Sequence, residues 1–212
     1  MRYQYQIKDV VDADFPEFAA RCHSEWSDIR RIVSENCGWS SHNAYKMLSA
    51  LDFGCGFGRN LGVLVELALK VCAVEREDIL FEKAQQLYPQ VSVSHVKSLA
   101  QKVFPVEHFN LVLSHTVLQH LRTSEAIEAA AEIARITKKG GYVLLTEETN
   151  PLRKSGDLNN PMDHCCTPRS VEDYHIMLGK KSFKLVYTEE RILERTYRFN
   201  GDCGHYMLFK RL

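Results

Sequence analysis

The sequence has no surplus of charge of either sign. Among its 212 residues, Lys and Arg number 27 and Asp and Glu number 27, so the formal net charge is zero and no basic run occurs. Proteins dedicated to nucleic acids usually carry a basic excess, because contacts to phosphate dominate their affinity. The charge balance therefore argues against a nucleic-acid partner and favours a small-molecule ligand.

The sequence also lacks a C-x-x-C pair and a long apolar run. Its seven cysteines show no disulfide framework, and the adjacent cysteines in the DHCC stretch at 163–166 do not suit one tetrahedral zinc site. Glu66 and Lys70 interrupt the most apolar stretch, and the polar N-terminus has no signal-peptide core. We therefore expect reduced thiols, no metal, no membrane span and a cytoplasmic location, and we leave a homodimer open.

The hydrophobic pattern predicts alternating strands and helices from about residue 46 onward. Thr123 or Ser124 is expected to cap the clearest helix, and a Gly-Gly pair is expected to end it. This alternation predicts an α/β fold with a Rossmann-like, doubly wound and mostly parallel sheet. The predicted strands cover residues 46–53, 70–75, 91–96, 109–116 and 142–148, and the predicted helices cover 60–69, 77–89, 123–141 and 167–180.

The two ends of the chain depart from this alternation. Residues 182–199 and 204–212 have strand-like patterns with no full helix between them, so they predict an antiparallel pair at the C-terminal edge of the sheet. The first 45 residues, with a helix expected over 15–35, form a predicted lid or cap on a domain of residues 46–212. The Asn-, Pro- and Gly-rich segment 149–168 is a long insertion, and loops of that length are usually functional.

A glycine-rich turn follows the first predicted strand, in the stretch LDFGCGFGRN at residues 51–60. The carboxyl ends of strands in open α/β sheets are where ligands bind. Arg59 stands where the dinucleotide fingerprint G-x-G-x-x-G requires its third glycine, and no Gly-Lys-Ser/Thr of a P-loop is present. Glu75 ends the next strand, where a carboxylate can accept hydrogen bonds from both hydroxyls of a ribose.

These elements together resemble a known family. LDFGCGFGRN is similar to the first motif of class I S-adenosylmethionine-dependent methyltransferases, and KSLAQKVFPVEHFNLVLSHTVLQHL resembles their adenine-binding and fourth-strand motifs. KKGGYVLLTE resembles their fifth strand, and TPRSVEDYHIMLGKKSFKLV resembles a helix–strand unit of small-molecule members. The resemblance covers residues 45–212 and implies S-adenosylmethionine as the cofactor.

The resemblance also implies roles for individual residues. It places Asp52, Gly54 and Gly56 against the methionine part of the cofactor and Glu75 on the ribose. Ser98 and Leu99 would meet the adenine, where many members have an aspartate in place of Ser98. Ser114 and His115 would line the other side of the cofactor. The full predicted cofactor-binding set is Asp52, Gly54, Cys55, Gly56, Arg59, Asn60, Glu75, Arg76, Ser98, Leu99, Ser114 and His115.

The expected reaction is methyl transfer to an oxygen or nitrogen of a small molecule, such as a sugar or a natural-product intermediate. Such a displacement requires positioning of the nucleophile, and a base only where the acceptor must lose a proton. We predict His115, Glu148 and His164 as the catalytic candidates, because they follow strands or lie in the insertion. A protein or RNA acceptor, and a cofactor-binding protein without catalysis, remain as alternatives.

Overall fold

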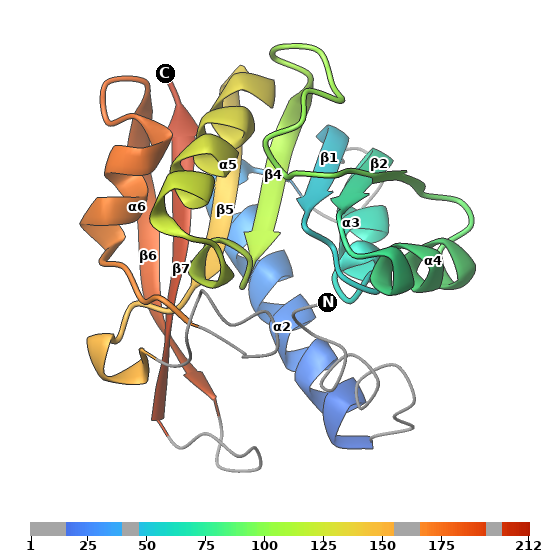
Figure 1. Ribbon diagram of the computed structural model, residues 1–212, viewed down its shortest axis with the longest axis horizontal. Helices are drawn as coiled ribbons and strands as arrows, with labels where there is room; N and C mark the ends of the chain where they lie inside the picture. Colours follow the sequence, from blue (N-terminus) through green and yellow to red (C-terminus); the bar gives the residue numbers. More distant parts are fainter. Residues whose placement is uncertain (1–15, 40–46, 155–165, 194–200) are drawn as a thin grey trace.

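The computed structural model describes residues 16–39, 47–154, 166–193 and 201–212. Seven strands of these residues form one sheet in the order β3-β2-β1-β4-β5-β7-β6 (Figure 1). The strands are β1 (Met47–Phe53), β2 (Ala68–Glu75), β3 (Ser92–His95), β4 (Phe109–His115), β5 (Thr137–Glu147), β6 (Phe183–Leu193) and β7 (Gly201–Arg211).

The sheet is parallel from β3 to β5 and antiparallel at its C-terminal edge. β1 pairs in parallel with β2 and β4, whereas β7 pairs antiparallel with both β5 and β6. The sequence prediction of a mostly parallel, Rossmann-like sheet with an antiparallel C-terminal edge is therefore confirmed. Because β1, β2, β4 and β5 run the same way, the residues at their carboxyl ends meet along one rim of the sheet.

Helices cover both faces of the sheet (Figure 1). The α2 helix (Pro16–Cys37), α3 (Leu61–Leu67) and α4 (Asp78–Leu87) contribute to one apolar cluster with one face of the strands. On the other face, α5 (Thr123–Ile136) and α6 (Val171–Leu178) contribute to a second cluster. Two short 3-10 helices, η2 (Leu118–His120) and η3 (Pro151–Arg153), follow β4 and β5 at the rim.

The α5 helix is shorter than the sequence pattern predicts, because its last residues join β5. The Oγ1 hydroxyl of Thr137 donates to the carbonyl of Ile133 at 2.7 Å, and Thr137 pairs with Phe109 in the sheet. The expected cap at Thr123 or Ser124 is also displaced. The helix begins at Thr123, and Arg122 precedes it, with its backbone N–H donating to the Glu125 carboxylate at 3.0 Å.

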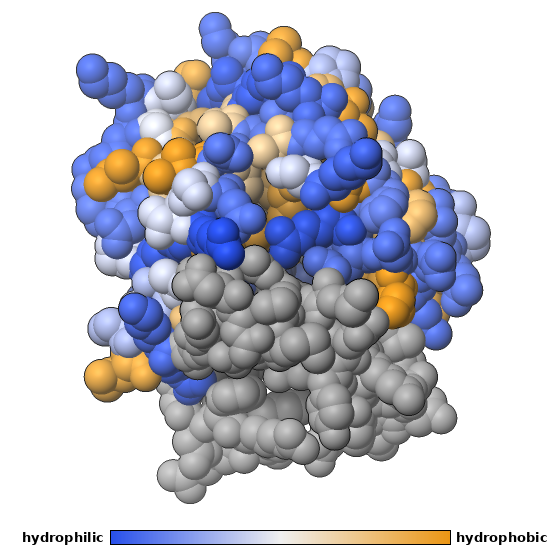
Figure 2. Space-filling view, viewed as in Figure 1, coloured by the Kyte–Doolittle hydropathy of each residue, from blue (hydrophilic) through white to orange (hydrophobic). Residues whose placement is uncertain are grey.

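The described residues also show the state of several cysteines and bear on metal sites and membrane-spanning helices. Cys37, Cys55 and Cys72 are free thiols. In the described ranges, no group of three or more His, Cys, Asp or Glu side chains could hold a metal ion, and no helix is long and apolar enough to cross a membrane. On the face shown in Figure 2, described residues are mostly hydrophilic, and apolar ones gather in small groups.

Candidate functional site

The glycine turn continues directly from β1 and is fixed to the end of β2. The backbone N–H groups of Gly54 and Cys55 both donate to the carbonyl of Val74 at 3.0 Å. Gly54 and Gly56 have φ angles of +74° and +59°, which favour glycine. A Cβ atom on Gly54 would lie 2.8 Å from a methyl carbon of Val117, whereas one on Gly56 would meet nothing within 4 Å. Gly54 therefore permits close packing, and Gly56 borders open space.

Two buried polar side chains flank this turn. Asp52, near the end of β1, is 2% exposed, and its Oδ2 atom has no hydrogen-bond partner among the described residues. The same holds for the Oδ1 atom of Asn60, which precedes α3. Burial raises the pKa of Asp52 to about 7, and the nearby Arg59 guanidinium opposes this shift. Buried acceptors without partners are rare in proteins, so both atoms point to a polar ligand at the turn.

Glu75 connects the end of β2 to the glycine turn. Its Oε2 accepts from the backbone N–H of Gly56 at 2.7 Å, and its Oε1 accepts from the N–H groups of Arg76 and Glu77 at 2.8 and 3.0 Å. Burial raises the pKa of Glu75, and the three N–H donors oppose that shift. A carboxylate offers about four lone-pair sites, so Oε2 keeps capacity for one more donor. The adjacent Arg76 side chain instead pairs with Glu77 at 3.2 Å.

His115 ends β4 and faces α2. Its Nε2 lies 3.4 Å from Oε1 of Glu25, and both side chains are 2% exposed. Burial lowers the pKa of His115 to about 3, although Glu25 acts in the opposite direction, so the imidazole is neutral near pH 7. The next residue, Thr116, has a φ of +55°, and its hydroxyl accepts from Arg59 at 3.4 Å. A β-branched residue in this conformation is strained, as is common at functional sites.

Arg59 lies between the glycine turn and α2. Its Nε is 3.4 Å from Oε2 of Glu25, whose Oε1 is 2.5 Å from Nη2 of Arg191 on β6. Burial disfavours a charged Glu25, but Arg59, His115 and Arg191 outweigh it and hold the pKa of Glu25 well below its usual value. A single carboxylate on α2 thus contacts the glycine turn, β4 and β6.

Ser114, the neighbour of His115, faces the opposite side of the sheet. Its hydroxyl donates to Oε1 of Glu147 at 3.4 Å. The Glu147 carboxylate, which is fully buried, also accepts from three consecutive backbone N–H groups, those of Val117, Leu118 and Gln119, at 3.0–3.1 Å. Burial raises the pKa of Glu147 to about 7, and these N–H groups oppose the shift. Glu147 therefore fixes the loop after β4, whose Val117 packs on Gly54.

The remaining predicted residues lie in different surroundings. Glu148 is buried and accepts from the N–H groups of Thr149 and Asn150 at 3.1 and 2.9 Å. Ser98 is exposed and accepts from the N–H of Ala100 at 3.2 Å, whereas Leu99 is buried and belongs to the apolar cluster that includes α5 and α6. Cys55 is buried, and burial raises the pKa of its thiol well above the usual value. His164 lies outside the described residues.

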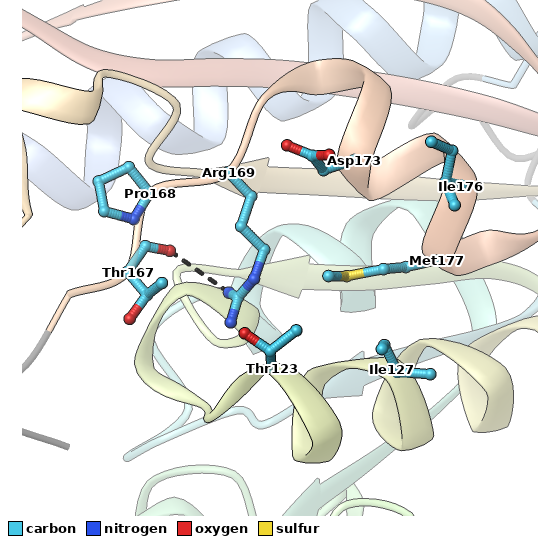
Figure 3. A pocket seen from close by; sticks show the side chains of 8 residues that line it. All are labelled: Thr123, Ile127, Thr167, Pro168, Arg169, Asp173, Ile176 and Met177. Atoms are coloured by element: carbon cyan, nitrogen blue, oxygen red, sulfur yellow. Dashed lines mark hydrogen bonds between the residues drawn. The ribbon is translucent and has the colours of Figure 1, made fainter.

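A groove between α5 and α6 contains none of the predicted site residues (Figure 3). The guanidinium of Arg169 lies in this groove. It donates hydrogen bonds to the backbone carbonyls of Thr167, Leu118 and Leu121 at 3.3, 2.8 and 2.9 Å, so its role is to fix the backbone. Ile127 and Ile176 are about half exposed there. The groove is lined by Thr123, Ile127, Thr167, Pro168, Arg169, Asp173, Ile176 and Met177.

Comparison with known proteins identifies the segment that holds this rim. Residues 51–145 match the family model of the methyltransferase domain. This segment, a little under half of the chain, is similar to the methyltransferase domains from which that model is built. The similarity implies S-adenosylmethionine as the cofactor, and the site fits it: Asp52 and Asn60 have acceptors without partners, Glu75 keeps an acceptor position, and Gly56 leaves space.

Two relatives and one solved structure are similar to parts of this chain. The chain is 30% identical over 97 residues to an uncharacterized methyltransferase of Bacillus subtilis, covering 44% of this chain and 40% of that protein. It is 30% identical over 115 residues to phosphoethanolamine N-methyltransferase 3 of Arabidopsis thaliana, covering 51% of this chain and 23% of that protein. The chain thus spans less than half the length of either relative. The N-methyltransferase NodS of Bradyrhizobium japonicum, solved with S-adenosylhomocysteine, has the same fold with a TM-score of 0.65, at 14% identity and coverage of 93% and 89%.

Sequence reasoning missed several residues that lie together at this rim of the sheet. Glu25 and Arg191 lie 166 positions apart in the chain, so no local pattern indicates their contact. One signal exists for Glu25, because it falls four residues before Ile29, on the buried side of α2. Thr116 and the role of Glu147 in the loop after β4 were also not predicted. The division of the chain at residue 45 stays a prediction, as do the roles of the individual site residues.

Proposed function

We propose that the protein transfers a methyl group from S-adenosylmethionine to an oxygen or nitrogen atom of a small molecule, such as a sugar or a natural-product intermediate. One observation carries this proposal. The acceptors of Asp52 and Glu75 lie at the ends of β1 and β2, and His115 lies at the end of β4 on the same rim. The groups that we propose bind the cofactor therefore share one edge of the sheet with a neutral imidazole.

When bound, S-adenosylmethionine supplies a methyl group on a positively charged sulfur, so the leaving group is already activated. The protein then has to orient the acceptor and exclude water. His115 stays neutral at pH 7 and can accept a hydrogen bond from an N–H or O–H group of the acceptor. A side chain with so low a pKa is a weak base, so we assign it orientation of the acceptor. This role suits an amine, which attacks through its own lone pair.

Two of the similar proteins support a nitrogen acceptor, since one is named a phosphoethanolamine N-methyltransferase and the other an N-methyltransferase. The proposed lid role of the N-terminal segment is supported by Glu25, which connects α2 to the glycine turn and to β6. The buried thiols of Cys55 and Cys72 support a reducing, cytoplasmic compartment.

The test is an assay with S-adenosylmethionine labelled on its methyl group. The protein is incubated with pooled small amines and alcohols, with total protein and with RNA, and label is counted in each fraction. We expect label in the small-molecule fraction and matching release of S-adenosylhomocysteine. Label only in protein or RNA would contradict the acceptor class. Cofactor binding without turnover in any pool would instead indicate a cofactor-binding protein without catalysis.

A further inference from the structure

Thr146 is a fully buried threonine whose hydroxyl has no hydrogen-bond partner among the described residues. It lies near the carboxyl end of β5, on the rim that carries His115. A buried hydroxyl without a partner costs stability, because folding removes it from water and nothing replaces the lost hydrogen bonds. Thr137, at the other end of β5, is equally buried, but its hydroxyl donates to the carbonyl of Ile133 at 2.7 Å. Thr146 therefore points to a polar partner that the described residues do not provide.

The side chains of Thr146 and His115 stand next to each other on one face of the sheet. The two residues are register partners on the parallel neighbours β5 and β4 (Figure 1). Leu144 and Leu113, two positions earlier on each strand, belong to the apolar cluster that includes α2, so strand alternation places Thr146 and His115 on that face. Neither side chain bonds to the other. The ends of β4 and β5 thus carry two adjacent groups with unused hydrogen-bonding capacity.

The contact with Glu25 determines what His115 offers to a ligand. A neutral imidazole carries one N–H group and one nitrogen lone pair. The Nε2 atom of His115 lies 3.4 Å from a carboxylate oxygen of Glu25, which is ionised and can only accept. The proton therefore lies on Nε2, and Nδ1, which has no partner among the described residues, presents its lone pair. Because a hydroxyl oxygen also accepts, Thr146 and His115 offer two neighbouring acceptors.

Two neighbouring acceptors match an uncharged primary amine, whose nitrogen has two N–H donors and one lone pair. Adjacent strands lie about 4.8 Å apart, and two N–H···acceptor bonds of about 3 Å from one nitrogen span a similar distance. Both side chains are buried, so an amine reaches them only when neighbouring side chains move aside, and it leaves its water behind. Loss of water disfavours the charged ammonium form. The free lone pair of the amine then remains available as the nucleophile.

An alcohol can bond to the same two side chains, because the hydroxyl of Thr146 can also donate. An alcohol has to lose its proton to react, however, and His115, with a pKa of about 3, is too weak a base to remove it near pH 7. An uncharged amine needs no base before it attacks. The pair therefore favours nitrogen over oxygen as the methyl acceptor.

We propose that the Thr146 hydroxyl and Nδ1 of His115 hold the two N–H groups of a primary amine, and that this pair limits the reaction to one methyl group. The inference rests on the proposed function, because it names the class of acceptor at the same site. The nitrogen lone pair forms the bond to the methyl carbon, the carbon–sulfur bond breaks and its electron pair stays on sulfur. The resulting ammonium loses a proton to water after release. The secondary amine so formed has one N–H group, so it bonds to only one of the two acceptors.

The first test compares valine at the two buried threonines of β5, since valine has nearly the shape of threonine without the hydroxyl. Thr146→Val removes an unpaired hydroxyl, so the urea midpoint of unfolding should stay the same or rise. Thr137→Val removes a paired hydroxyl, so its midpoint should fall. A fall for Thr146→Val as large as that for Thr137→Val would mean that Thr146 already has a partner within the protein, and would overturn the inference.

The second test counts the methyl groups transferred. The amines are benzylamine, phosphoethanolamine and the N-methyl derivative of each, with labelled S-adenosylmethionine and mass spectrometry of the products. We expect the wild type to stop at one methyl group and to prefer each primary amine over its N-methyl derivative by about tenfold or more in kcat/KM, the equivalent of one hydrogen bond. Thr146→Val should bring this ratio close to one without changing S-adenosylhomocysteine affinity. Thr146→Ser should restore the ratio, and Thr137→Val should keep it.

The outcomes separate this inference from the proposed function. Efficient addition of a second methyl group by the wild type, or an unchanged ratio in Thr146→Val, overturns the inference. Label in alcohols but in none of these amines also overturns it and leaves the proposed function intact. Failure to bind S-adenosylhomocysteine, or binding without label in any pool, contradicts the proposed function and the inference with it.

Discussion

The Oε2 atom of Glu75 accepts a hydrogen bond from the backbone N–H of Gly56 at 2.7 Å, so one carboxylate shapes the glycine turn and keeps an acceptor position beside it. Replacing Glu75 with Ala removes this acceptor and the position left for a ribose hydroxyl. Hydrogen bonds to charged groups contribute about 1.5–3 kcal/mol, so we expect S-adenosylhomocysteine affinity to fall roughly 10- to 100-fold. Calorimetry checks this against Glu82→Gln, an exposed change on α4. Equal affinities would place the ribose elsewhere.

Gly54 and Gly56 should respond differently to alanine, although both have positive φ angles. Gly54→Ala adds a clash with Val117 to the backbone strain, and we expect it to lower the free energy of unfolding by about 3 kcal/mol. Gly56→Ala adds strain alone, about 1 kcal/mol, but its methyl group enters the space proposed for the cofactor. Urea unfolding and calorimetry separate the two effects. A stable Gly56→Ala protein with wild-type affinity would show that the open space is not the cofactor site.

Local patterns were sufficient to predict much of this fold. The apolar run before the glycines predicted β1, and alternating segments predicted the parallel sheet, because each depends on residues close in sequence. The end of α5 was mispredicted because Thr137 pairs with Phe109, a contact between distant residues. The Glu25–Arg191 contact was not predicted for the same reason, because the two residues lie far apart in the sequence. Predicted residues such as Ser114 and His115 are adjacent in sequence, yet strand alternation sends one toward Glu147 and the other toward Glu25.

Glu147 should matter for stability through the loop after β4. Alanine at this position leaves the backbone N–H groups of Val117, Leu118 and Gln119 without their acceptor in a buried site. We expect the free energy of unfolding to fall by about 2–4 kcal/mol, since each unsatisfied buried donor is costly. Urea unfolding at pH 8 measures this loss of stability. The control is Glu128→Ala, at an exposed position of α5. A loss no larger than that of the control would mean that water replaces the carboxylate without cost.

His115 should make the free energy of unfolding depend on pH. Its pKa is about 3 in the folded protein, below an unfolded value of about 6.5, so the unfolded state binds more protons between these values. The contribution of the neutral His115 side chain to the free energy of unfolding is therefore complete above pH 6.5 and is lost as the pH falls toward 3. From pH 7 to pH 5, the stability of the wild type relative to His115→Asn should decrease by about 2 kcal/mol. A constant difference from chemical unfolding at both pH values would show that the imidazole is not buried in its neutral form.

Binding of the cofactor at the glycine turn is the claim on which the whole account depends. Calorimetric titration of the wild-type protein with S-adenosylhomocysteine, and in parallel with NAD, tests it most directly. The account predicts saturable binding of S-adenosylhomocysteine at one site per chain and no binding of NAD. Binding of NAD alone, or of neither ligand, would contradict it.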